Sequence, residues 1–149
     1  MSEPACWSWP VPPNVADWQP APDPTVALLI AAGLNMPQDT GEDRDRALLR
    51  WWQQGRCAIC GRPDLHLVDD HDHATGLSRG YLCTSCNTRE GVTKGETEGP
   101  FACYRQRPPV AILGIQLRYW DPVRRDYAQP QPAPALADRW EETAGRGLL

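Results

Sequence analysis

The 149-residue sequence lacks any apolar run of about 18 residues, the minimum length for a helix that crosses a membrane. Residues 1–9 also lack the basic start and the apolar stretch of a secretory signal peptide. Both absences favour a cytoplasmic protein. The 16 prolines cluster at the two ends of the chain, which leaves the middle third to fold tightly and excludes a large α/β enzyme with a buried nucleotide site.

Lysine is almost absent, and no segment of the chain is strongly basic. Residues 1–49 carry two arginines against seven acidic residues, and residues 50–107 carry eight basic against seven acidic residues. Residues 108–149 carry five of each, so the net charge of the whole chain is −4. Charge alone therefore does not predict nucleic-acid binding.

The first 24 residues hold seven prolines with Trp7, Trp9 and Trp18 between them. Proline at this density excludes a helix or a central strand, so residues 1–24 are predicted to form a flexible arm. We expect the arm to collapse onto the domain, and the alternative is that its tryptophans insert into DNA or a partner.

Residues 25–54 are predicted to be a helical extension. Residues 25–34 form a short apolar stretch that ends near Gly33, and Asp39 and Thr40 are candidate N-caps for a second helix over 42–54.

Leu48, Trp51 and Trp52 share one face of that second helix, and Gly55 ends it. This spacing favours packing of both tryptophans in the core beneath the cysteines, over the alternative of a surface on which bases stack.

Two CxxC pairs, separated by 22 residues, dominate the middle of the chain. In a reducing cytosol such pairs predict a tetrahedral zinc site, and a redox-active pair is the alternative. The predicted zinc ligands are Cys57, Cys60, Cys83 and Cys86. Cys6 and Cys103 fall outside the pattern and are expected to be free thiols.

The insert between the cysteine pairs is predicted to be a hairpin, with strands at 65–71 and 77–82 and a turn at 74–76. A short helix is expected after Cys83, ending at Gly91.

The run Asp69-Asp70-His71-Asp72-His73 is unusually dense in carboxylates and imidazoles. In a strand Asp70 and Asp72 point one way and His71 and His73 the other, unless the strand ends or bulges here. Carboxylate and amide oxygens, as in Asp70 and in Asn87 after the last cysteine, suit Mg²⁺ or Mn²⁺, and a neutral histidine can take a proton from water. The pattern indicates a one-metal phosphodiesterase, and a solvated strand end is the alternative.

The segments GRCAICGRP at 55–63 and VDDHDHATGLSRGYLCTSCNTREG at 68–91 resemble the recombination endonuclease VII family of HNH nucleases. The resemblance is in register over about a quarter of the chain and implies a metal-dependent DNA endonuclease. The implied fold class is a small α+β protein with a ββα-metal (HNH) core stapled by the four-cysteine zinc site, a helical N-terminal extension and proline-rich termini.

The resemblance also implies roles for individual residues. Asp70 and Asn87 resemble the ligands of the catalytic Mg²⁺ or Mn²⁺, and His71 resembles the general base. The other matched positions are His73, which positions the phosphate or leaving group, Glu90, a further active-site carboxylate, and Arg79, with a structural or phosphate-facing role.

Other basic residues flank this site and are candidates for contacts with DNA phosphates, although scattered surface charge is the alternative for each. They are Arg56, Arg62, Arg89, Lys94, Arg105 and Arg107, of which Arg89 and Lys94 are favoured together with Arg79. His66 lies outside the motif and is interpreted as a strand or loop residue.

The nuclease core is predicted to span 55–107, with a partly flexible C-terminal extension at 108–149. In that extension the segment 110–120 is apolar but of undecided type, and Pro108-Pro109 breaks any helix before it. Residues 136–144 favour a terminal turn.

Two alternatives to a general duplex nuclease remain. One is a non-catalytic zinc-binding adaptor for DNA or protein that keeps the fold. The other is a resolvase of branched DNA, which depends on the geometry of a dimer. In phage resolvases of the family, long helices interlock two subunits. No comparable helix is predicted here, so monomer and homodimer are both open. A phage-encoded chain would act in the host cytoplasm.

Overall fold

The computed structural model describes residues 5–34, 41–63 and 66–129, and its helices and strands agree with the small α+β class that the sequence predicts. The helices are α1 (Pro24–Ala31), α2 (Gly41–Gln53), α3 (Thr84–Val92), α4 (Pro100–Gln106) and α5 (Pro109–Leu113), with 3-10 turns η1 (Cys6–Ser8) and η2 (Val15–Asp17). The strands are β1 (Val68–Asp72), β2 (Leu77–Leu82), β3 (Trp120–Asp121) and β4 (Asp126–Tyr127). Within the described ranges, no helix is long and apolar enough to span a membrane.

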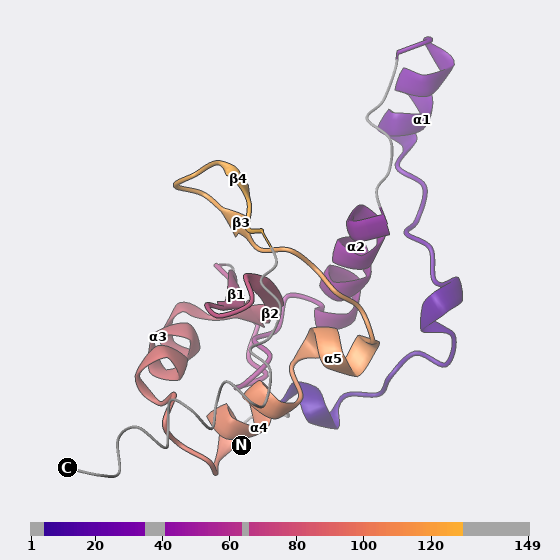
Figure 1. Ribbon diagram of the computed structural model, residues 1–149. Helices are drawn as coiled ribbons and strands as arrows, with labels where there is room; N and C mark the ends of the chain where they lie inside the picture. Colours follow the sequence, from indigo (N-terminus) through magenta and orange to yellow (C-terminus); the bar gives the residue numbers. More distant parts are fainter. Residues whose placement is uncertain (1–4, 35–40, 64–65, 130–149) are drawn as a thin grey trace, which may run out of the picture.

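The β1–β2 hairpin lies at the centre of the molecule, with α3 and α5 packed against it (Figure 1). Helix α2 contacts α5, and α4 contacts the N-terminal turn η1. Helix α1 stands away from the other helices, and none of its residues is buried (Figure 1). The β1–β2 hairpin, which is the insert between the two cysteine pairs, and the helices packed on it therefore form the folded centre of the chain.

The hairpin is antiparallel and contains a β-bulge at Arg79. Asp70 pairs with Gly80 whereas His71 pairs with Ser78, so Arg79 is an extra residue on β2. The predicted turn is confirmed, since Gly76 closes it with a φ of 70°. Strand β1 begins at Val68, three residues later than expected, and the predicted start at Leu65 lies outside the described residues.

The segment 110–120, whose type the sequence left undecided, changes from helix to extended chain. Helix α5 ends at Leu113, and the chain then runs along the free edge of β2. There Ser78 N donates to Leu117 O at 2.9 Å and Tyr119 N donates to Gly76 O at 3.1 Å. This edge pairing brings Tyr119 beside the hairpin turn.

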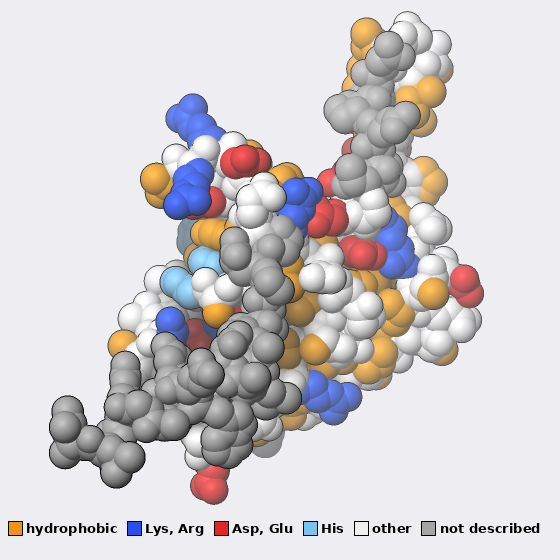
Figure 2. All heavy atoms as spheres, in the orientation of Figure 1, with side chains coloured by type: hydrophobic (Ala, Val, Ile, Leu, Met, Phe, Trp, Pro, Cys, Tyr) orange, Lys and Arg blue, Asp and Glu red, His pale blue; other side chains and the backbone are white. Residues whose placement is uncertain are grey.

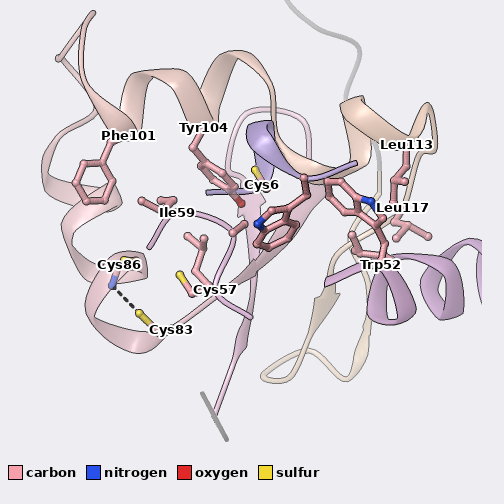
Figure 3. Close-up of a cluster of buried hydrophobic side chains, with 14 of the residues drawn as sticks. Cys6, Trp52, Cys57, Ile59, Cys83, Cys86, Phe101, Tyr104, Leu113 and Leu117 are labelled. Atoms are coloured by element: carbon pink, nitrogen blue, oxygen red, sulfur yellow. Dashed lines mark hydrogen bonds between the residues drawn. The ribbon is translucent and has the colours of Figure 1, made fainter. Parts of the chain in front are cut away.

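The core joins the N-terminal arm to the segment that carries the cysteines (Figure 3). Cys6 is fully buried and Trp9 is 5% exposed, and the Trp9 and Trp52 rings meet edge to face at 5.2 Å. The arm is therefore packed on the domain at these residues. Burial raises the pKa of Cys6 to about 12, so this side chain stays a neutral thiol.

Two local expectations about the helices were wrong. Trp51 is not a core residue: it is 49% exposed and lies against Trp18, because the buried face of α2 is centred on Leu48, Leu49 and Trp52. Helix α3 passes through Gly91 and ends at Val92. The candidate caps Asp39 and Thr40, and the turn at 136–144, lie outside the described residues.

Gly80, which follows the bulge, packs closely against Pro109 of α5. A Cβ atom on Gly80 would lie 2.6 Å from Cγ and 2.9 Å from Cδ of Pro109. We expect Gly80→Ala to lower the free energy of unfolding by about 1–3 kcal/mol, because the proline ring cannot move aside without shifting α5. Urea denaturation of the metal-loaded protein measures this change.

The matched control is Gly91→Ala, at a helical glycine whose Cβ would have no atom within 4 Å. That change should leave stability unaltered or raise it by up to about 1 kcal/mol. Equal stability of the two variants would contradict the close packing of β2 on α5.

Candidate functional site

The four cysteines of the two CxxC pairs converge in space. One sulfur atom from each lies within 4.8 Å of all the others, and Cys60 Sγ and Cys83 Sγ are 4.0 Å apart. Sulfurs about 2.3 Å from a tetrahedral zinc lie roughly 3.8 Å from one another, so the cluster is compatible with a structural metal such as zinc. All six cysteines lie in the described ranges, and none forms a disulfide.

Local backbone structure prepares both halves of this cluster. In the first half, Gly61 N donates to Cys57 O at 2.9 Å. In the second, Cys83 is the N-cap of α3, and its sulfur accepts from Cys86 N at 3.5 Å (Figure 3). The start of α3 is therefore fixed by the same residues that would hold the metal.

The cysteines differ in how readily they ionise. Burial alone would raise the pKa of Cys60, but hydrogen bonds from the backbone and side chain of Arg62 lower it to about 7. Burial raises the pKa of both Cys57 and Cys86. Since zinc binds thiolates, metal binding must release protons from the buried cysteines.

We expect one zinc per chain, and Cys86→Ser should lose it and unfold the core, because folding and metal binding are coupled in a site of this kind. Elemental analysis and circular dichroism measure the two effects. The control is Cys103→Ser, at an exposed cysteine outside the cluster, which should keep both zinc and fold. A folded, zinc-free preparation of the unmodified protein would disprove the zinc assignment.

Asp70 is buried, 5% exposed, and is held by an arginine and a tyrosine. Arg79 donates to both carboxylate oxygens, from Nε at 2.8 Å and from Nη2 at 3.0 Å. Tyr104 of α4 donates its hydroxyl to Oδ2 at 2.8 Å. A two-point guanidinium contact and a hydroxyl satisfy this carboxylate without water.

The same guanidinium also reaches Glu90, which is 3% exposed. Arg79 Nη2 lies 3.0 Å from Glu90 Oε2, and Arg105 Nη1 lies 3.3 Å from Glu90 Oε1. Arg79 therefore sits between two buried carboxylates, one from β1 and one from α3. Removing it would leave both negative charges with too little compensation, which is costly in a protein interior.

His71 forms part of a three-ring stack at the end of β1. Its imidazole lies 3.6 Å from the Tyr119 ring, at an interplanar angle of 13°, and 4.5 Å from the His73 ring, at 18°. Burial and the neighbouring His73 both lower the pKa of His71, which keeps the imidazole neutral at neutral pH. His71 is thus oriented by flat contacts and available as a proton acceptor.

A pocket of about 340 Å³ opens beside this stack. It brings together five of the residues predicted from the sequence, together with Arg105 from the flanking set: His71, His73, Arg79, Glu90, Lys94 and Arg105. Figure 2 shows histidine side chains on a face that also carries basic groups. The three cations of the pocket outnumber the two carboxylates of its lining, Asp72 and Glu90, and the remaining positive charge beside a neutral imidazole suits a phosphate group.

The remaining predicted residues lie outside the lining of this pocket. Asn87 is half-buried in the first turn of α3, and Arg89 is exposed with its guanidinium 5.7 Å from the Phe101 ring. Asp70 contacts Arg79 and Tyr104, whereas His71 contacts His73 and Tyr119, as predicted for the two faces of the strand. Asp72, expected on the face of Asp70, instead lines the pocket with the two histidines. Outside the four cysteines, the described residues hold no further group of three His, Cys, Asp or Glu side chains that converge as metal ligands do.

Sequence reasoning did not find Tyr104 or Tyr119. Both lie beyond the last cysteine, in segments without a recognisable motif, and each reaches the site through contacts made at long range in the sequence. A tyrosine in the sequence does not by itself indicate a site residue, because tyrosine is equally common as a packing residue of the core.

Comparison with known proteins agrees with this organisation. Residues 32–105 match the recombination endonuclease VII family, and the chain belongs to that family. The Gene 59 proteins of Mycobacterium phages L5 and D29 are each 54% identical to the chain over 39 residues, which cover 24% of this chain and 24% of each relative. The chain thus spans about a quarter of the length of these curated relatives. No solved structure matches it.

Proposed function

We propose that this chain is a metal-dependent DNA endonuclease with His71 as the general base. The observation that carries the proposal is the stacked, neutral His71 at the wall of a pocket lined by Arg79, Lys94 and Arg105. Family membership supports nuclease activity and a DNA substrate. The chain order of hairpin, cysteine pair and helix supports a ββα-metal core of the HNH type.

In this mechanism His71 takes a proton from the attacking water. Its ring is held flat against Tyr119, which fixes the plane of the imidazole at the end of β1. A lowered pKa leaves the imidazole unprotonated at neutral pH, as a base requires. His73, which also stacks on His71, positions the phosphate or the leaving group.

Lys94 and Arg105 would bind the phosphate on either side of the cleaved bond. Lys94 is exposed at the pocket wall, and Arg105 is already oriented by Glu90 and by the Thr93 carbonyl oxygen. Hydrogen bonds from cations to phosphate oxygens are strong and position the substrate. Arg89 is a further candidate for DNA contact from the exposed side of α3.

Asp70 and Asn87 would hold the catalytic Mg²⁺ or Mn²⁺, because carboxylate and amide oxygens are the ligands that such ions prefer. A bound ion would neutralise phosphate charge and stabilise the leaving oxygen. Arg79 balances the charge of Asp70 in this structure, and an ion held by this carboxylate would take over that role. Arg79 would remain paired with Glu90, which it also contacts.

We expect His71→Ala to lower plasmid cleavage in Mg²⁺ by about 10²- to 10⁴-fold, the usual contribution of a general base. Zinc content and DNA affinity should change little. The matched control is His66→Ala, at an exposed histidine outside the pocket, which should cleave as the unmodified protein does. Undiminished cleavage by His71→Ala would refute the assignment of the base. A synthetic four-way junction tested beside the plasmid would show whether branched DNA is preferred.

Tyr119 should act as a positioning residue for His71. We expect Tyr119→Leu to lower kcat by about 10- to 100-fold with little change in KM, because a loosened base loses its alignment with the attacked phosphate. Tyr119→Phe keeps the ring face and should restore most of the rate. Equal kcat values for the Leu and Phe variants would show that the stack has no role in catalysis.

A further inference from the structure

Helix α4 carries a side chain that contacts the site but has no task in the proposed mechanism. Tyr104 is fully buried, and its hydroxyl donates to Asp70 Oδ2 at 2.8 Å. Its ring belongs to the same buried cluster as Cys6, Ile59 and Phe101 (Figure 3). Because the ring is enclosed in a close-packed core, its hydroxyl has a fixed position beside Asp70.

The two oxygens of the Asp70 carboxylate differ in the hydrogen bonds that they accept from the described residues. Oδ2 accepts from Arg79 Nε at 2.8 Å and from the Tyr104 hydroxyl, whereas Oδ1 accepts from Arg79 Nη2 at 3.0 Å. An ionised carboxylate has about four acceptor positions, two on each oxygen. With respect to these bonds, the position left for a cation is on Oδ1, and Tyr104 is the group that fills Oδ2.

The orientation of this carboxylate depends on both of its partners. The Arg79 guanidinium lies at the end of a long side chain and is shared with Glu90, whose Oε2 is 3.0 Å from Nη2. The terminal torsion of an aspartate is soft, so a carboxylate held by Arg79 alone could turn together with it. The Tyr104 hydroxyl comes from a third element, α4, and fixes that rotation independently of Arg79.

We propose that Tyr104 is a positioning residue for the catalytic ion, because it holds Asp70 in the orientation that leaves Oδ1 for that ion. The inference rests on the proposed nuclease function and adds a residue to it. Groups that hydrogen-bond to a metal ligand orient it, and their removal typically weakens metal binding or activity by about 10- to 100-fold. Since a hydroxyl is uncharged, its removal keeps the charge balance between Asp70, Arg79 and Glu90.

The test is Tyr104→Phe, which keeps the ring in the core and removes only the hydroxyl. Mn²⁺ binding is measured without DNA, by electron paramagnetic resonance of the free ion, on the full chain after its zinc content and circular dichroism have been verified. We expect the affinity for Mn²⁺ to fall by about 10- to 100-fold. The Mg²⁺ concentration that gives half-maximal plasmid cleavage should rise by a similar factor, and saturating Mg²⁺ should restore most of the rate.

Two control variants separate positioning from packing. Tyr81→Phe removes a tyrosine hydroxyl that is not among the donors to Asp70, which are Arg79 and Tyr104. Phe101→Leu alters the buried face of α4 and leaves the Tyr104 hydroxyl in place. Both variants should bind Mn²⁺ as the unmodified protein does.

Unchanged Mn²⁺ affinity in Tyr104→Phe would overturn the inference, as would an equal loss of affinity in Phe101→Leu. If Tyr104→Phe does not fold, the chain with 3-fluorotyrosine at position 104 takes its place, since this label keeps the hydroxyl. Mg²⁺ should then shift the fluorine resonance with the midpoint that cleavage shows. A resonance that does not respond to Mg²⁺ would contradict a bond between this hydroxyl and the carboxylate that holds the ion.

Failure of the proposed function gives a different result. An unmodified protein that cleaves plasmid DNA, with a Tyr104→Phe variant that needs no more Mg²⁺ than it does, refutes only the role of Tyr104. An unmodified protein that cleaves no DNA in Mg²⁺ or Mn²⁺ refutes the proposed nuclease.

Discussion

The site is organised around the Arg79 guanidinium, which lies between the buried carboxylates of Asp70 and Glu90. Two negative charges in the interior need a cation to balance them. Here the cation is the side chain of Arg79, the extra residue of the bulge in β2. The bulge allows Arg79 to reach Asp70 on the paired strand and Glu90 on α3 at once. The glycine that follows it brings β2 against Pro109, so the packing of α5 depends on the same irregularity.

The four cysteines and the arginine have separate tasks. The cysteine cluster joins the loop before the hairpin to the start of α3. It therefore fixes where this helix, with Asn87 and Glu90, lies relative to the hairpin. Arg79 then joins the hairpin to α3 from the other end. With both ends fixed, His71 projects from the end of β1, where the edge segment that carries Tyr119 stacks on its ring. A chain with a small hydrophobic core gains rigidity at its site from such polar and metal-binding contacts.

The features that could be predicted from the sequence are those with local causes. A CxxC pair, a turn closed by Gly76 and a helix capped by Cys83 each depend on a few neighbouring residues, and each is found where expected. The contributions of Tyr104 and Tyr119 depend on how distant segments pack, which no local pattern encodes. The wrong prediction for Trp51 also arises from packing between distant segments. Helical spacing indicates an apolar face of α2, but the segments packed on it decide that Trp52 and not Trp51 is buried. The bulge that places Arg79 between two acids was foreseen only as a general possibility for the hairpin.

The central claim is that a hard catalytic ion and a structural zinc occupy different sites. It is tested most directly by brief exposure to a low concentration of EDTA, followed by replacement of single metals and measurement of plasmid cleavage and zinc content. Cleavage should stop while zinc and fold remain, because four thiolates would hold zinc far more tightly than the proposed ligands Asp70 and Asn87 would hold Mg²⁺. Mg²⁺ or Mn²⁺ alone should then restore it. Recovery only with added zinc would contradict the account.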